Sequence, residues 1–309
     1  MSKRVLITGG SGFIGANLVR RALEDGHDVH LILRPGHAPW RLQEIVNAVH
    51  VHQAGIEDAD AVRRIVHAVR PDWVFHLAAY GAYSNQTGMA RMVSTNLLGW
   101  VALLDACAGV GAEAIVHTGS SSEYGARRTP ASETDMVEPN SDYAVTKAAA
   151  THYGQLAART RDLPVTTLRL YSAYGPFEEP TRLIPTLLTH ALRGSLPPLV
   201  SPETPRDFVY VGDMVDAMLA VAASKDVPQA AIYNISTGIE TRLRDIVSLV
   251  RQKLNVAVEP QWGSMPARAW DVDVWSGSNE KIAREIGWTP KTSLSDGLDK
   301  TLEWMRPRT

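Results

Sequence analysis

A strand, a glycine-rich turn and a helix follow one another in residues 3–18, KRVLITGGSGFIGANL. The short β-branched run that begins at Arg4 suits a buried parallel strand. Gly9 allows the tight turn, Gly12 lets a pyrophosphate approach a backbone without a Cβ, and Gly15 lets the helix pack closely on the strand. Free N–H groups at the positive end of the helix then face the phosphates. The stretch therefore predicts a dinucleotide-binding turn.

Strand-like and helix-like patterns alternate through the first half of the chain. Strands are predicted at residues 4–7, 29–33, 49–52, 73–77, 114–118 and 165–170, with helices at 58–69, 93–108 and 143–160. Strands separated by helices of this size predict an α/β fold, a doubly wound parallel (Rossmann) sheet with right-handed crossovers.

The second half of the chain is less regular. Proline and glycine interrupt residues 175–205, and strand-like patterns recur at 208–210 and 231–235. We predict a Rossmann domain that binds NAD(P), formed by residues 1–170 plus about 207–236. A smaller C-terminal substrate domain is predicted at about 171–206 and 237–309.

The composition limits the kinds of partner. Apolar residues make up 45% and charged residues 21%, which is ordinary for a globular chain. The net charge of −2 argues against a nucleic acid bound by bulk electrostatics. The single cysteine, Cys107, excludes an internal disulfide, and we expect no metal ion. The start reads as a strand broken by glycines rather than a signal peptide, and no apolar run reaches membrane-spanning length. We therefore expect no membrane partner and a cytoplasmic location.

A tyrosine and a lysine stand four residues apart in YAVTK, as Tyr143 and Lys147. On a helix this spacing places both side chains on one face. A tyrosine with a pKa of ~10 is a poor acid or base at neutral pH. A lysine one turn away can stabilise the phenolate and bind a cofactor ribose. A serine-rich strand end, TGSSSEYG at 118–125, precedes the pair and makes a chance match less common.

The second strand ends in Leu33 and Arg34. In an NAD-binding unit an acidic residue usually ends this strand and binds the ribose 2′-OH. Arg34 stands at that place or one position after it, and a guanidinium suits a 2′-phosphate. Arg34 therefore favours NADP(H) as the cofactor, with NAD as the alternative. Arg41 is a second, weaker candidate for the phosphate.

The motifs as a set resemble the extended short-chain dehydrogenase/reductases that act on nucleotide sugars. TGGSGFIG, HLAA, STNLLG, SSSEYG, YAVTK, LRLYSAYGP, RDFVYVGD, PAR and IGWTP occur in family order along the whole chain. The resemblance implies a catalytic Ser-Tyr-Lys set, with Tyr143 and Lys147 as two members. Counting back from Tyr124 without a gap selects Ser120 as the third, and one deletion selects Ser121, so both serines stay candidates.

The resemblance also implies binding residues. Those for the cofactor, besides Arg34, Tyr143 and Lys147, are Gly9, Gly12, Phe13, Ile14, Gly15, Ile56, Leu77, Ala78, Ala79 and Asn96. Those for the nucleotide-sugar substrate are Tyr80, Ser122, Ser172, Arg182, Arg206 and Arg268. By the resemblance Arg206 and Arg268 bind the diphosphate, because arginine forks pair with phosphate oxygens. Relatives commonly form homodimers through two helices, here those beginning at Val93 and Tyr143.

Two positions depart from the family pattern. Gly55 stands where the adenine loop usually has an aspartate, which puts a side-chain hydrogen bond to adenine in doubt. Ser172 stands where the family often has an asparagine that touches the sugar nucleotide.

Three reactions share this scaffold. A 4,6-dehydratase needs an acidic residue just after the catalytic hydroxyl, where this chain has Ser121 and Ser122, and Glu123 comes one place late. A 4-epimerase recycles tightly bound NAD, whereas a 4-ketoreductase uses exchangeable NADPH. Arg34 favours NADPH, and HLAAYGAYSNQ together with SSSEYG resembles the CDP-paratose and CDP-abequose synthase group.

The leading hypothesis is thus NADPH-dependent reduction of the C4 ketone of a nucleotide-linked deoxy sugar. An NAD-dependent nucleotide-sugar 4-epimerase is the alternative. A 4,6-dehydratase and a non-catalytic NADP-sensing protein are weaker alternatives.

Overall fold

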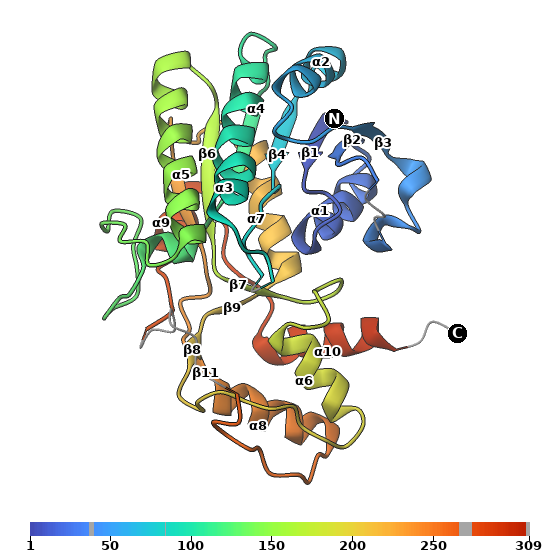
Figure 1. Ribbon diagram of the computed structural model, residues 1–309, viewed down its shortest axis with the longest axis vertical. Helices are drawn as coiled ribbons and strands as arrows, with labels where there is room; N and C mark the ends of the chain where they lie inside the picture. Colours follow the sequence, from blue (N-terminus) through green and yellow to red (C-terminus); the bar gives the residue numbers. More distant parts are fainter. Residues whose placement is uncertain (37–39, 84, 266–273, 307–309) are drawn as a thin grey trace.

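The computed structural model describes residues 1–36, 40–83, 85–265 and 274–306. Its larger lobe contains a sheet with helices on both faces, and a smaller lobe lies at one end of it (Figure 1). The sheet has seven strands in the order β10-β6-β5-β4-β1-β2-β3, and all pairings are parallel. The strands are β1 (Arg4–Thr8), β2 (Asp28–Leu33), β3 (His50–Gln53), β4 (Trp73–His76), β5 (Ala114–Ser120), β6 (Val165–Leu170) and β10 (Ile232–Ile235). The predicted doubly wound parallel sheet is confirmed.

Alternate residues of each strand face opposite layers of helices, because successive side chains of a strand point to opposite faces. Val5 and Ile7 of β1 lie in a core shared with α1 (Phe13–Glu24) and α7 (Val211–Ala223). Leu6 lies in a second core on the other face. That core is shared with α2 (Ala59–Val69), α4 (Gly99–Cys107) and α5 (Asp142–Arg161). With both faces covered, the strands read as the continuous apolar runs seen in the sequence.

The helix predicted at residues 93–108 begins earlier and is not uniform. It consists of α3 (Met89–Met92), the π-helical η3 (Val93–Leu98) and α4. The buried side chain in the π-helical turn is Asn96, whose amide binds groups outside the helix. Hydrophobic periodicity cannot reveal such a turn, because it depends on contacts with other elements.

The smaller lobe has its own core, formed by α6 (Leu183–Ala191), α8 (Leu243–Leu254) and α10 (Leu294–Met305). Two short ribbons connect it to the sheet: β7 (Ser172–Tyr174) with β9 (Phe208–Tyr210), and β8 (Pro205–Arg206) with β11 (Thr241–Arg242). The strand predicted at 208–210 therefore exists but lies outside the main sheet.

The chain returns to the larger lobe near its end. Ile282 in α9 (Glu280–Ile286) and Trp288 after it join the core around α1 and α7. The Trp288 indole N–H donates to the carbonyl of Asp213 at 3.1 Å. A segment assigned from the sequence to the substrate domain thus helps to cover the sheet, and the predicted domain boundaries stay a prediction.

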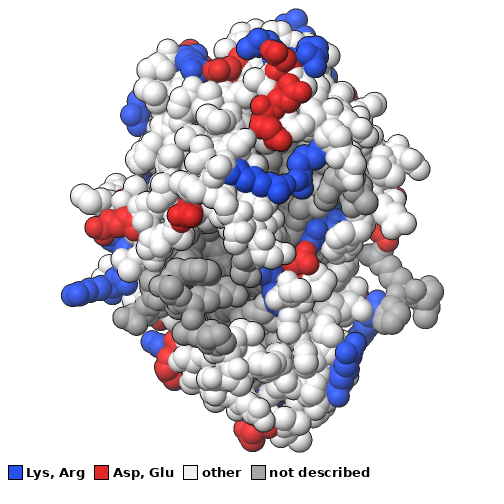
Figure 2. All heavy atoms as spheres, in the orientation of Figure 1, with Lys and Arg blue, Asp and Glu red and all other residues white. Residues whose placement is uncertain are grey.

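Charged side chains of both signs are interspersed over the face shown in Figure 2. On that face no broad basic surface of the kind used for nucleic acids is seen among the described residues. Within the described ranges, none of the helices combines the length and the apolar character needed to span a bilayer.

Candidate active site

The glycine turn after β1 is tightly packed. Gly9 has φ +72°, and a Cβ there would lie 2.5 Å from the backbone nitrogen of Ala78. A Cβ on Gly15 would lie 2.2 Å from the carbonyl oxygen of Gly9. Gly12 is the N-cap of α1 and has no capping side chain, and Phe13 and Ile14 open the helix. These contacts leave backbone N–H groups at the helix start, which fits the pyrophosphate of a dinucleotide.

We expect Gly15→Ala to weaken cofactor binding and to destabilise the fold. The added methyl collides with backbone, which cannot rotate away, and overpacking of this kind typically costs about 1–3 kcal/mol. Thermal unfolding and a fluorescence titration with NAD(P)H measure both effects. Gly26→Ala is the control: Gly26, unlike Gly15, has positive φ, so that variant carries backbone strain, but a Cβ there meets nothing within 4 Å. Equal cofactor affinity in the two variants would contradict the role of Gly15.

The loop after β4 lies against the glycine turn. Leu77 donates its N–H to the carbonyl of Thr8 at 3.0 Å, and Ala78 donates to the Thr8 hydroxyl at 3.3 Å. Asn96 fixes the next part of the loop, accepting from the Tyr80 N–H at 2.7 Å and donating to its carbonyl at 2.8 Å. The predicted cofactor residues Leu77, Ala78 and Ala79 therefore sit beside the turn.

Asn96 also connects this loop to α5, which carries Tyr143 and Lys147. Its amide donates to the Thr146 hydroxyl at 2.9 Å, and that hydroxyl donates to the carbonyl of Tyr143 at 2.8 Å. The side chain of Asn96 thus orders the loop and the first turn of α5 together.

Ser120 and Tyr143 meet at the carboxyl end of β5. Burial, together with the charge of Glu123, raises the pKa of Tyr143 to about 12, and the Ser120 hydroxyl opposes the rise. The Ser120 and Ser122 hydroxyls are 2.8 Å apart. Ser121 is buried at 8% exposure and turns away into the 3₁₀ turn η4 (Ser121–Tyr124). Of the two candidate serines, Ser120 is the one that contacts the tyrosine.

Lys147 lies one turn along α5 and is almost completely buried. Its ammonium donates to the carbonyl of Thr118 and lies 3.5 Å from Nε2 of His117. Burial lowers the pKa of Lys147 to about 8, against the raising effect of Glu123. The lysine therefore stays mostly charged at neutral pH, although it loses its proton more readily than an exposed lysine.

Two buried histidines form the floor under Lys147. Burial and the lysine lower the pKa of His76 to about 3, and the same causes hold the pKa of His117 well below its usual value. Both rings stack on Trp100, at centroid distances of 4.9 and 4.6 Å. His76 also bonds the Thr8 hydroxyl at 2.7 Å. These neutral rings pack the site and do not exchange protons at neutral pH.

Arg34 is exposed and lines an open hollow with Gly55, Glu57 and Asp58. The Glu57 carboxylate folds over Gly55. A Cβ on that glycine would lie 2.8 Å from a carboxylate oxygen of Glu57. Asp58 caps α2 by accepting from the N–H of Ala61 at 3.0 Å. The hollow thus presents one cation and two carboxylates at the ends of β2 and β3.

Two further residues of this region are committed to protein contacts. Ile56 is buried against Gly99 of α4. Arg41 donates to the carbonyl of Phe177 at 2.7 Å and pairs with Glu179 at 3.1 Å. The role of Arg41 as a weaker candidate for the cofactor phosphate stays a prediction.

The predicted substrate residues come from several elements. Tyr80 donates its hydroxyl to the carbonyl of Thr87 at 3.3 Å, and the Arg91 guanidinium covers its ring. Arg182 precedes α6 and lies 3.7 Å from the Glu178 carboxylate. Ser172 lies on β7.

Arg206 and Arg268 are the two arginines predicted to bind the diphosphate. Arg206 lies on β8, donates to the carbonyl of Pro205 at 2.7 Å and stacks over Trp275. Arg268 lies outside the described residues.

The comparisons with known proteins agree with this geometry. The NAD dependent epimerase/dehydratase family matches residues 5–236. The chain belongs to this family. A UDP-glucose 4-epimerase of Mycolicibacterium smegmatis is 30% identical, and the match covers 98% of each chain.

Two solved structures of family members have the same fold. A UDP-glucose 4-epimerase of Thermotoga maritima with UDP-glucose has a TM-score of 0.89 at 28% identity, covering 98% of both chains. A UDP-glucose 4-epimerase of Thermus thermophilus with NAD has a TM-score of 0.86 at 29% identity, covering 99% of this chain and 100% of the other. The predictions of an extended short-chain dehydrogenase/reductase, of its fold and of an enzyme are confirmed.

This family member buries an ion pair that sequence reasoning missed. The Arg169 guanidinium donates from Nε to the Glu123 carboxylate at 2.9 Å, with exposures of 2% and 0%. The same carboxylate accepts from the N–H of Ser120 at 2.8 Å and the hydroxyl of Thr151 at 3.1 Å. Glu123 therefore lies directly beneath Ser120, the candidate catalytic serine. In the sequence the ion pair is visible only as one charged residue in each of two otherwise uncharged strand ends, SSSEYG and TLRLY.

Glu178 is a second missed residue. Burial raises its pKa to about 8, and its Oε2 has no hydrogen-bond partner among the described residues. Its neighbour Arg182 lies over the ring of Tyr83. Burial raises the pKa of Tyr83, the charge of Arg182 opposes the rise, and the charge of Glu178 adds to it. Nothing in the local sequence FEEPTR distinguishes this buried carboxyl from an exposed one.

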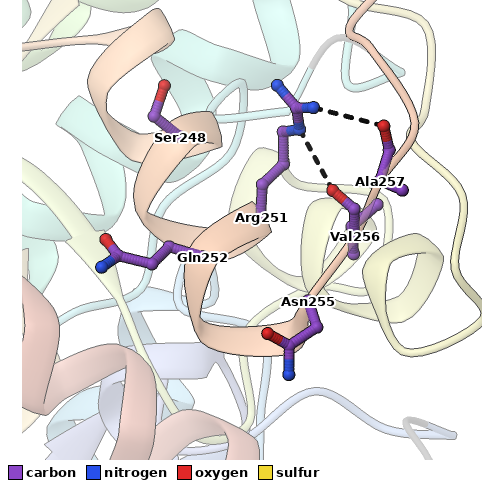
Figure 3. Close-up of a pocket in the computed structure, with 6 residues that line it drawn as sticks. All are labelled: Ser248, Arg251, Gln252, Asn255, Val256 and Ala257. Carbon is purple, nitrogen blue, oxygen red and sulfur yellow. Dashed lines mark hydrogen bonds between the residues drawn. The ribbon is translucent and has the colours of Figure 1, made fainter.

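A separate surface hollow lies at the end of α8 (Figure 3). Its arginine, Arg251, is held by the carbonyls of Val256 and Ala257 and by Glu259. None of the candidate site residues lines it.

Proposed function

We propose that this family member transfers hydride at carbon 4 of a nucleotide-linked sugar and is a nucleotide-sugar 4-epimerase that uses NAD. The observation that carries the proposal is that the Ser120 hydroxyl, at the end of β5, acts directly on Tyr143, with Lys147 one turn away on α5. The similarity to three UDP-glucose 4-epimerases supports the reaction and a uridine-linked sugar as substrate.

The residues divide the chemistry in a simple way. A nicotinamide held in the glycine cradle would accept hydride from carbon 4 and return it to the other face of the resulting ketone. Tyr143 carries the proton of the C4 oxygen, giving it up as the ketone is reduced and receiving it as the alcohol is oxidised. The Ser120 hydroxyl holds the same oxygen by a hydrogen bond. Lys147 stabilises the phenolate form of Tyr143 by its charge.

Specificity comes from groups remote from carbon 4. We propose that Arg206 and Arg268 bind the diphosphate, and that Tyr80, Ser122, Ser172 and Arg182 line the sugar and nucleoside sites. Binding energy gained at the diphosphate positions the C4 atom for attack. Ser121 and Ser122 stand where a 4,6-dehydratase needs a carboxylate, and the buried Glu123 is engaged by Arg169, so dehydration is the weaker assignment.

The second candidate is the 4-ketoreductase predicted from the sequence, with a CDP-linked deoxy sugar as the substrate. It is favoured by Arg34, which stands exposed at the end of β2 where an NAD enzyme usually has a carboxylate. Glu57 and Asp58 line the same hollow and disfavour a 2′-phosphate. The comparisons favour the epimerase, which is why it stands first.

One experiment separates the two reactions. Purified enzyme is mixed with UDP-glucose without added cofactor, and the products are resolved by chromatography. We expect conversion to the C4 epimer, because an epimerase regenerates its bound cofactor in each cycle. The same enzyme is then given a nucleotide-linked 4-keto-6-deoxy sugar and NADPH. Stoichiometric loss of NADPH without epimerisation would replace the epimerase by the ketoreductase.

Cofactor choice is tested separately by titrating NAD(H) and NADP(H) into the wild type and Arg34→Ala. If Arg34 binds a 2′-phosphate, NADP(H) binds more tightly by about 1–3 kcal/mol, the usual size of a hydrogen bond to a charged group, and the variant loses that preference. Arg193→Ala, an exposed arginine after α6, is the control. Equal affinities in the wild type leave Arg34 as a solvated loop residue and favour NAD.

A homodimer and a cytoplasmic location stay predictions. Leu98 and Leu156 are 55% and 53% exposed, and Val145 is 42% exposed. They lie on the two helical segments through which this chain is predicted to form a dimer, as its relatives commonly do. Exposed aliphatic residues on these helices support the dimer.

A further inference from the structure

Three histidines and an aspartate gather on one face of the sheet, at the edge formed by β2 and β3. Asp28 and His30 are two residues apart on β2, and His50 and His52 are two residues apart on β3. Residues two apart on a strand face the same way. The parallel register pairs His30 with His50, so the rings from the two strands stand side by side.

The side chains of Asp28, His30 and His50 converge on a small volume. Nε2 of His30 lies 3.2 Å from one oxygen of Asp28, and Nε2 of His50 lies 3.2 Å from the other. One ligand atom from each of these residues lies within 4.8 Å of the others. The two rings are stacked, with centroids 4.6 Å apart and planes 21° apart.

These separations suit a tetrahedral metal ion. Zinc binds imidazole nitrogen and carboxylate oxygen at about 2.0–2.2 Å, which places neighbouring tetrahedral ligand atoms roughly 3.4 Å apart. The measured 3.2 Å contacts need little movement to reach that spacing. Imidazole with carboxylate is a donor set for zinc and related transition metals rather than for magnesium.

His52 provides a supporting contact. Its Nε2 lies 3.0 Å from Nδ1 of His30, the ring nitrogen that faces away from Asp28. A second hydrogen bond of this kind fixes the tautomer and orientation of a metal-bound histidine.

We propose that Asp28, His30 and His50 form a binding site for a zinc-like divalent ion, with His52 orienting His30. The side chain of His50 is 65% exposed and that of Asp28 43%, so water completes the coordination from the open side. The ligands lie toward the amino ends of their strands, whereas the glycine turn follows the carboxyl end of β1. The ion therefore joins the edge strand β3 to its neighbour β2 and takes no part in the reaction at Tyr143.

The set contains no cysteine, which is why a cysteine count predicts no metal ion. The signal in the sequence is the pair of alternating motifs DVH and HVH in two consecutive strands. It becomes a site only through the parallel register that sets His30 beside His50.

The test is calorimetric titration of ZnCl₂ into the full-length protein, carrying no added histidine tag and freed of metal by EDTA. We expect one zinc per chain and a rise in the unfolding temperature. His50→Ala should weaken zinc binding by at least about tenfold, and His52→Ala by about 10–100-fold, the usual effect of losing an orienting partner. MgCl₂ should give no comparable binding.

His152→Ala is the matched control, an exposed histidine on α5 that should leave zinc binding unchanged. His50→Asn, closer in size to the native residue, repeats the test if the alanine variant unfolds. Cobalt titration gives a second readout, because a four-coordinate Co²⁺ site absorbs in the visible. Absence of stoichiometric zinc binding by the wild type, or equal affinity in His50→Ala and His152→Ala, overturns the proposal.

Discussion

Tyr143→Phe should lower kcat by a factor on the order of 10²–10⁴, the usual range for loss of a general acid–base. This corresponds to about 3–5 kcal/mol of activation free energy. The change removes one oxygen from a half-buried ring and leaves its packing in place. Because the lost group acts on the proton of the C4 oxygen, the affinities for cofactor and nucleotide sugar should change little. Steady-state kinetics and calorimetric titration with both ligands measure the two quantities.

Tyr153→Phe is the matched control on the same helix. Its hydroxyl accepts a hydrogen bond from Arg161 at the surface, 2.9 Å away, so kcat should stay at the wild-type value. A Tyr143→Phe enzyme with wild-type kcat would falsify the assignment of the proton carrier. A variant that loses ligand binding as well would point instead to a damaged site, and circular dichroism would then decide whether the fold is intact.

Arg169→Met should destabilise the protein by about 3–5 kcal/mol, the usual cost of leaving one charge of a buried pair without its partner. Glu123 is 0% exposed, so its carboxylate cannot turn to water when the guanidinium is removed. The Thr151 hydroxyl and the Ser120 N–H remain as partners, but neither carries a compensating charge. Urea denaturation gives the free energy of unfolding, provided that the transition is two-state.

Two further variants separate charge from packing. Arg284→Met removes an arginine whose side chain is 67% exposed and pairs with Glu285, and it should change stability little. The double variant Glu123→Gln, Arg169→Met removes both charges and should recover part of the lost stability. If Arg169→Met is as stable as Arg284→Met, the buried pair does not contribute as described.

Features encoded over short stretches were predictable from the sequence. The glycine turn, the strand before it and the helix after it depend on neighbouring residues, and each lies where it was predicted. The alternation of apolar strands with amphipathic helices was enough to predict a parallel sheet. Tyr143 and Lys147 share a helix face because the four-residue spacing is local.

Pairings between distant segments were not predictable. Glu123 and Arg169 are 46 positions apart and meet because β5 and β6 are neighbours in the sheet. A charged residue in a strand reads as an exposed side chain until its partner is known. The same reason hid the contacts of Asn96, whose π-helical turn follows from binding partners on a loop and on α5.

The sequence alone therefore determined the family, the order of the strands along the chain and the residues that could perform the chemistry, because these follow from local spacing and from motifs. Tertiary structure decided which of them meet. It placed Ser120 rather than Ser121 against Tyr143, because the chain turns sharply into η4 after Ser120 and directs the next side chain inward. It also brought His30 beside His50 through strand register, which no local pattern specifies.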